Sequence, residues 1–173
     1  GIIEPANFNC PGQIVVSGEQ KAIQKAVEII KASGKGKTIQ LTVSGPFHSS
    51  LMKNAENKLR NYLKNVNINP ALSTSQMDFE VRKGGINNAN IKVIANVSAD
   101  YVKTSDEIKE SLAKQVSSAV KWEDTIIRMI NSGVDKFVEV GPGKVLSGLM
   151  KRINKEVFVT NVEDKVSLDR ISI

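Results

Sequence analysis

The chain has 173 residues, of which 40% are apolar and 24% charged, so it is long enough for one domain with a sizeable core. No apolar run reaches membrane-spanning length, and no signal sequence opens the chain. A single cysteine, Cys10, excludes an internal disulfide and a cysteine-based zinc cluster. We therefore expect a globular protein in the reducing cytoplasm.

The net charge of +6 and the pI near 9.4 favour an acidic partner. Nucleic acid, an acidic protein and a phosphorylated cofactor all fit such a charge, as does a solvated basic face without a specific partner. No repeated aromatic stacking positions and no nucleic-acid recognition motif accompany these charges. The basic residues gather in two segments, with Lys31, Lys35 and Lys37 in the first and Lys144, Lys151, Arg152 and Lys155 in the second.

The first 43 residues have the pattern of part of a small α/β layer. A short extended piece with little to pair against locally is followed by a Cys-Pro-Gly turn and a β-branched strand. Ser17 and Gln20 have the spacing of a capping box, which predicts a helix that ends at Gly34. The predicted elements are an extended piece over 1–8, a turn at 10–12, and strands over 13–16 and 38–43 with the helix between them.

The only histidine, His48, lies where the second predicted strand stops at a Gly-Pro pair and a helix begins. Apolar residues recur at helical spacing from Leu51 to Val66, and Ser49 or Ser50 supplies the N-cap. A helix N-terminus disfavours the imidazolium and helps to keep a neutral ring available as a base. His48 is therefore a candidate general base, although a lone histidine taken by itself is better explained as a capping or surface residue.

Strands and helices alternate through the rest of the chain, after an Asn-, Ser- and Gly-rich loop over 65–90 with a hairpin arm at 77–81. Thr104 and Glu107 form a second capping box. The alternation favours a parallel or mostly parallel sheet covered by helices, with a site at the carboxyl ends of the strands. The predicted strands span 91–97, 136–140 and 157–160, and the predicted helices run from the capping box to about 116, over 122–130 and over 145–153.

The sequence lacks residues that several known catalytic and binding motifs require. The turn over 141–144 (GPGK) lacks the earlier glycine and the following Ser or Thr of a phosphate-binding loop, since Val138 and Val145 hold those positions. No G-x-S-x-G elbow holds a serine nucleophile, and one histidine with one cysteine predicts no metal site. The residues by themselves therefore predict a candidate base without its nucleophile.

Four blocks of the sequence resemble the malonyl-CoA:acyl carrier protein transacylase family of bacterial fatty-acid synthesis. They occur in the family's order and spread over nearly the whole chain. The blocks are NFNCPGQIVVSG (7–18), GPFHS (45–49), QVSSAVKW (115–122) and EVGPGKVLSGL (139–149).

The resemblance implies an α/β fold and covers only the C-terminal half of an enzyme about twice as long. Residues 1–44 would be the later part of a ferredoxin-like subdomain. Residues 45–173 would be the C-terminal half of an α/β-hydrolase-like acyltransferase core. Residues 71–90 look like an insertion or loop relative to the family, and Ala119 stands where the family usually has proline.

The family's reaction is a two-step acyl transfer through a malonyl-serine ester, with malonyl-CoA as substrate and no cofactor or metal. His48 matches the catalytic base, and Gln115 matches the residue whose backbone carbonyl holds the imidazole. Phe47 matches the malonyl-preferring form of the motif, and Asn9 is carried over as a substrate-binding candidate. The nucleophilic serine, the oxyanion-hole glutamine and the carboxylate-binding arginine belong to the half that this chain does not resemble.

The resemblance also implies partners: acyl carrier protein, malonyl-CoA and the N-terminal half of the enzyme, with no nucleic acid and no membrane. Carrier protein is acidic, so the basic residues Lys35, Lys37, Lys151 and Arg152 are candidates for docking it. The isolated chain is expected to be inactive. The alternative is a non-enzymatic fragment that only binds carrier protein or CoA.

Overall fold

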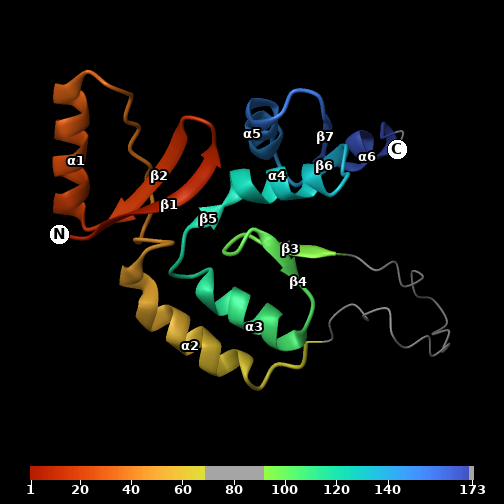
Figure 1. Cartoon of the computed structure of the whole chain (residues 1–173), viewed down its shortest axis with the longest axis horizontal. Coiled ribbons are helices and arrows are strands. Elements are labelled where there is room, and N and C mark those ends of the chain that lie inside the picture. The colour runs from red at the N-terminus through yellow and green to blue at the C-terminus, as the bar shows by residue number, and fades with distance from the viewer. Residues whose placement is uncertain (69–91, 172–173) are drawn as a thin grey trace.

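The computed structural model describes residues 1–68 and 92–171 as a mixed α/β structure (Figure 1). The predicted hairpin arm at 77–81 and the proposed insertion at 71–90 lie outside the described residues. The elements are β1 (Ile3–Cys10), β2 (Gln13–Gly18), α1 (Gln20–Ser33), η1 (Ser50–Met52), α2 (Lys53–Leu63), β3 (Val93–Ala95), β4 (Asp100–Val102), α3 (Ser105–Lys114), β5 (Val120–Lys121), α4 (Trp122–Asn131), β6 (Lys136–Val140), α5 (Val145–Ile153), β7 (Phe158–Val162) and α6 (Lys165–Asp169).

The described strands form three small sheets, and the prediction of one mostly parallel sheet is wrong. The order β2-β1-β5 makes the first sheet, while β3 with β4 and β6 with β7 make the other two. The pairs β1–β5 and β6–β7 are parallel, whereas β1–β2 and β3–β4 are antiparallel. The tight turn at Pro11 and Gly12 folds β2 directly back on β1, so the first residues do have a local partner.

Two local predictions in the first part of the chain fail. Residues 38–43 form no strand, and Ile39 in their middle is 78% exposed. A strand needs a partner for its backbone groups, and no described strand pairs with this segment. The capping box of Ser17 and Gln20 is also absent, because Ser17 belongs to β2 and Glu19 holds the N-cap position of α1.

The local signals in the second half hold better. Thr104 and Glu107 form the predicted capping box of α3, with both reciprocal bonds present. Helices α4 and α5 and strand β6 lie where the sequence places them, and β7 begins one residue later and ends two residues later than predicted. Three short elements, β4, β5 and α6, were not predicted, because segments of two to five residues carry no periodic signal.

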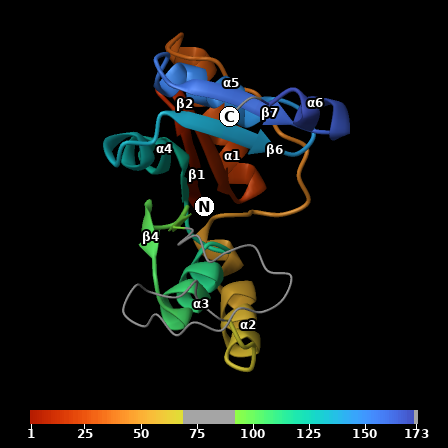
Figure 2. The same ribbon diagram turned by 90° about the vertical axis from the view of Figure 1, so that its right-hand side faces the viewer.

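The helices and sheets pack in two groups (Figures 1 and 2), and β5 lies between them in Figure 1. Helix α4 lies against β1 and α5, and helix α3 lies beside α2 and the β3–β4 pair. The buried apolar residues are few and come from both groups. They are Ala6, Cys10, Leu63, Ala95, Ala113, Ile126, Leu149 and Met150. Among the described residues, no helix is long and apolar enough to cross a membrane.

Replacement of Ile126 tests this packing, because Ile126 on α4 is 1% exposed while its neighbour Ile127 is 41% exposed. We expect Ile126→Ala to lower the free energy of unfolding by about 2–4 kcal/mol, through lost burial and the cavity left behind. Ile127→Ala is the matched control and should cost less than about 1 kcal/mol. Urea unfolding followed by circular dichroism measures both, and equal losses would show that α4 is not packed as described.

Candidate active site

The ring of His48 is held by the turn that follows α3. Its Nδ1 lies 2.8 Å from the backbone oxygen of Gln115 and 3.2 Å from that of Ser118. Carbonyl oxygens only accept hydrogen bonds, so these partners assign the proton of the neutral ring to Nδ1. The lone pair then lies on Nε2, which can accept a proton. The contact with Gln115 is the one that the family resemblance implies.

The backbone at His48 is also fixed by this turn. The His48 N–H donates to the carbonyl of Val116 over 3.3 Å, and the residue has φ of +59°. A non-glycine residue in this left-handed region is strained and persists where its surroundings hold it. Three bonds from one residue to one turn therefore define both the backbone and the ring at this position.

The acceptor turn uses carbonyls that a helix end leaves free. Gln115 is the C-cap of α3, and the last turn of a helix has backbone oxygens without intrahelical partners. The N–H groups of Val116 and Ser117 return to Ala113 and Lys114 over 3.2 Å each, which continues the helix as a tight turn. The negative end of the dipole of α3 therefore faces Nδ1.

Ser49 holds the predicted N-cap position of η1, but its side chain makes no capping bond, and a carboxylate on a distant strand bonds the first turn instead. The hydroxyl of Ser49 donates to the Pro46 carbonyl over 2.6 Å and so caps nothing. The Glu4 carboxylate on β1 instead accepts from the Ser50 N–H at 2.7 Å and from its hydroxyl at 2.8 Å. These bonds from Ser50 lower the pKa of Glu4.

A charged cluster joins α2 to α3 beneath the histidine turn. The carboxylate of Glu56 is fully buried and accepts from Lys53 at 2.7 Å, from Arg60 at 2.6 Å and from the hydroxyl of Ser117. Arg60 also donates to Glu110 on α3 through two bonds of 3.0 Å. Burial raises the pKa of Glu56, but the bonds from Lys53, Ser117 and Arg60 outweigh it and hold that pKa at about 2.

Sequence reasoning missed this cluster, although part of its signal is visible. Lys53, Glu56 and Arg60 have the i,i+3 and i,i+4 spacing of ion pairs on one helix face. The same spacing is common on solvated helices, where it carries no functional meaning. What distinguishes Glu56 is its burial against Ser117, a residue 61 positions away, and local spacing does not reveal that contact.

The other predicted site residues lie at different distances from this arrangement. Phe47 directly precedes the histidine, is 48% exposed and lies over Gly45, about 3.6 Å from where a Cβ would stand. Asn9 is half-buried near the end of β1, and the hydrogen bonds of the described residues do not join its side chain to His48. Their roles in substrate binding stay predictions.

The four basic docking candidates divide into two kinds. Lys35 and Lys37 lie exposed in the segment between α1 and η1, and Lys151 lies exposed on α5. Arg152 differs, because its guanidinium donates to the Gln13 side chain at 2.6 Å and to the Pro11 carbonyl at 3.4 Å. It ties α5 to the β1–β2 turn and is therefore occupied within the chain.

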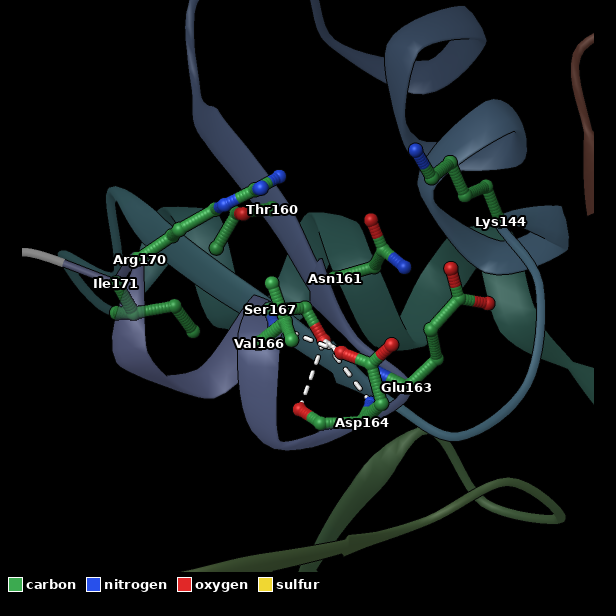
Figure 3. A pocket seen from close by; sticks show the side chains of 9 residues that line it. All are labelled: Lys144, Thr160, Asn161, Glu163, Asp164, Val166, Ser167, Arg170 and Ile171. Carbon is green, nitrogen blue, oxygen red and sulfur yellow. Dashed lines mark hydrogen bonds between the residues drawn. The ribbon is translucent and has the colours of Figure 1, made fainter.

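A separate cavity of about 270 Å³ lies between β7 and α6 (Figure 3). Both charge signs line it, and its Asp164 is held by bonds to Ser167. The backbone N–H of Gly143 nearby donates to Glu163 at 3.0 Å, so the GPGK turn does not offer this group to a phosphate. The lining residues are Lys144, Thr160, Asn161, Glu163, Asp164, Val166, Ser167, Arg170 and Ile171, and His48 is not among them.

Across residues 1–68 and 92–171, no group of three or more His, Cys, Asp and Glu side chains is placed to hold a metal ion. The site described here consists of the imidazole of His48 and the carbonyls that hold it. Such a site can accept a proton at Nε2 and return it, which is the work of a general base and acid.

Comparison with known proteins gives this site its context. No family model matches the sequence. The malonyl CoA-acyl carrier protein transacylase of Bacillus subtilis is 40% identical over 168 residues, which are 97% of this chain and 47% of that protein. The crystal structure of the transacylase from Clostridium perfringens matches with a TM-score of 0.82 and 44% identity, over 98% of this chain and 48% of that one. The chain is homologous to these transacylases. It spans about half of their length, which confirms the predicted match to one half of the family.

The structural match extends to a malonyl-transacylase solved in complex with a type II PKS acyl-carrier protein. That protein is 32% identical, with a TM-score of 0.83 over 97% of this chain and 48% of its own. The likeness confirms the predicted α/β acyltransferase fold over this chain's length. The division at residue 44 into two domains stays a prediction.

The charged cluster predicts a specific dependence of stability on pH. In the unfolded chain Glu56 takes up its proton near pH 4.5, but in the folded chain it does so only near pH 2. The stability that it contributes is therefore complete above pH 4.5 and is lost as the pH falls toward 2. Between pH 4.5 and pH 2, the free energy of unfolding of Glu56→Gln should therefore fall by about 3 kcal/mol less than that of the parent. Urea unfolding at a series of pH values measures this difference. Asn131→Ala, an exposed change that removes no titratable group, should keep the parent slope, and a parent slope in Glu56→Gln would contradict the cluster.

Proposed function

We propose that this chain, together with the N-terminal half of a transacylase, transfers malonyl groups from malonyl-CoA to the phosphopantetheine thiol of acyl carrier protein. The observation that carries the proposal is the hold on His48, whose Nδ1 lies 2.8 Å from the carbonyl of Gln115. It leaves Nε2 free to act as the base. The homology to named transacylases supplies the reaction class.

The proposed reaction has two steps that use the imidazole in the same way. A serine hydroxyl of the other half gives its proton to Nε2 of His48 while its oxygen attacks the thioester carbonyl. The CoA sulfur leaves and takes that proton, so a malonyl-serine ester remains. In the second step the phosphopantetheine thiol gives its proton to Nε2, its sulfur attacks the ester, and the serine oxygen recovers the proton.

The exposed strands support an N-terminal half as a partner. Parallel sheets are normally covered on both faces, yet the parallel pair β6–β7 leaves Val140 80% exposed and Phe158 56% exposed. Apolar surface of this kind marks a contact with further protein. In the proposal, the second half supplies the missing cover together with the serine.

The remaining parts of the proposal follow from the transacylase assignment. The reaction belongs to fatty-acid synthesis in the cytoplasm and needs no cofactor besides its substrate. The basic residues meet an acidic carrier protein, and neither nucleic acid nor a membrane is a partner. Phe47, beside the base, lines the acyl site and favours a malonyl group.

The activity is tested by co-expressing this chain with the N-terminal half of the Bacillus subtilis relative that its match does not cover. We expect the complex to transfer labelled malonyl to carrier protein, while the chain alone shows no transfer. His48→Ala should reduce kcat about 10²–10⁴-fold, because a general base contributes that much. Asn131→Ala, exposed at the end of α4, is the control and should match the parent. Full activity in His48→Ala would refute the assigned role.

Carrier-protein docking gives a second test, because electrostatic contacts weaken with salt. Replacement of Lys35, Lys37 and Lys151 by alanine should raise Kd for carrier protein about tenfold at low salt, and the difference should shrink in high salt. The control replaces three other exposed lysines, Lys58, Lys103 and Lys165, which makes the same change in net charge. Equal weakening in both triple variants would mean that net charge alone attracts the carrier. A different outcome would favour the alternative of a binding fragment. In that outcome this chain alone binds carrier protein, but its complex with the N-terminal half transfers no malonyl.

A further inference from the structure

We propose that Glu56 and Ser117 are positioning residues, which hold the acceptor turn of α3 in place and thereby fix the tautomer of His48. The catalytic consequence rests on the proposed function, whereas the tautomer can be observed without it. Among the described residues, neither side chain is hydrogen-bonded to the imidazole, so the pair acts through the backbone carbonyls of Gln115 and Ser118.

Ser117 lies within the turn that holds His48. It lies between Val116, whose carbonyl holds the His48 backbone, and Ser118, whose carbonyl holds the ring. The turn is a short continuation of α3, and isolated turns at helix ends fray readily. The hydroxyl of Ser117 is bonded to the Glu56 carboxylate, which anchors the turn to α2.

The carboxylate of Glu56 is a rigid anchor for this turn. Glu56 is 0% exposed, and its two oxygens are shared among Lys53, Arg60 and Ser117. Arg60 spans to Glu110 on α3, and Glu110 in turn pairs with Lys114 at 3.4 Å. The carboxylate therefore cannot rotate away without leaving a buried charge unpaired, which is costly.

A carboxylate matches the groups that surround it at position 56. A carboxylate offers only acceptors, and here each of its three neighbours is a donor. An amide in its place would turn donors toward Lys53, Arg60 or the hydroxyl. The cluster starts at Lys53, five residues after the histidine, so one short segment carries both the ring and the anchor of the turn that holds it.

Ser117→Ala is the cleaner probe, because it breaks the link to the turn and leaves both cations paired with Glu56. His48 is the only histidine, so a long-range proton–nitrogen NMR spectrum of the nitrogen-15-labelled chain shows one imidazole. At alkaline pH, where the ring is neutral, we expect the parent to have its proton on Nδ1. Ser117→Ala should lower the ratio of the Nδ1–H to the Nε2–H tautomer about fivefold, as expected for a weakened hydrogen bond.

The matched control is Ser111→Ala on the same helix, whose hydroxyl makes no hydrogen bond among the described residues, and it should keep the parent ratio. The amide spectrum of each variant checks its fold. Ser117→Cys keeps the side-chain volume with a poor donor, so it should shift the ratio in the same direction even where the alanine variant fails to fold. A parent ratio in a folded Ser117→Ala or Ser117→Cys variant would overturn the proposal.

Kinetics of the co-expressed complex separate this inference from the proposed function. With both correct, Ser117→Ala lowers kcat about tenfold and leaves KM for malonyl-CoA unchanged, and Ser117→Thr, which keeps the hydroxyl, restores most of the rate. A tautomer shift in a complex that transfers no malonyl would support the positioning pair and refute the function. Transfer that depends on His48 but not on Ser117, with no tautomer shift, would refute the positioning pair alone.

Discussion

The arrangement around His48 depends on one interaction, the bond from its Nδ1 to the backbone oxygen of Gln115, 67 residues further along the chain. It joins the start of one helical segment to the end of another and requires both to be fixed in register. The Glu4 cap secures the first of these ends, and the Glu56 cluster secures the second. The surrounding structure can be understood as the set of contacts that keeps this single distance short.

A backbone acceptor suits this purpose for a physical reason. In a Ser-His-Asp triad a buried carboxylate orients the imidazole, and that charge must itself be desolvated and held. The carbonyls of Gln115 and Ser118 are neutral, and the end of α3 leaves that of Gln115 without an intrahelical partner. The buried carboxylate of this structure, Glu56, lies one step further away, where two cations compensate its charge and it can hold the turn.

The parts of the fold that could be predicted are those written in local sequence. The capping box of Thr104 and Glu107 and the helix beginning at Trp122 depend on residues within one or two turns, and both are present. Residues 38–43 have the apolar pattern of a strand, but no described strand pairs with them. The pattern of one segment does not show whether a partner strand lies beside it. The contacts of Ser50 with Glu4 and of Ser117 with Glu56 span 46 and 61 residues, so no spacing rule reveals them. Gln115, whose carbonyl accepts from the imidazole, could be identified in the sequence only through the family resemblance.

The two kinds of surface in this chain divide the work of the proposed enzyme. The bonds that hold His48 go to backbone carbonyls of this chain, and the carboxylates of Glu4 and Glu56 bond Ser50 and Ser117 on either side of this contact. The parallel strands β6 and β7, in contrast, expose apolar residues such as Val140 that further protein would cover. Hydrogen bonds within this chain orient the imidazole. In the proposed enzyme, the exposed apolar residues of β6 and β7 form the surface to which the rest of the core attaches. In such a division the attaching half does not have to orient the base, because contacts within this chain already hold the ring.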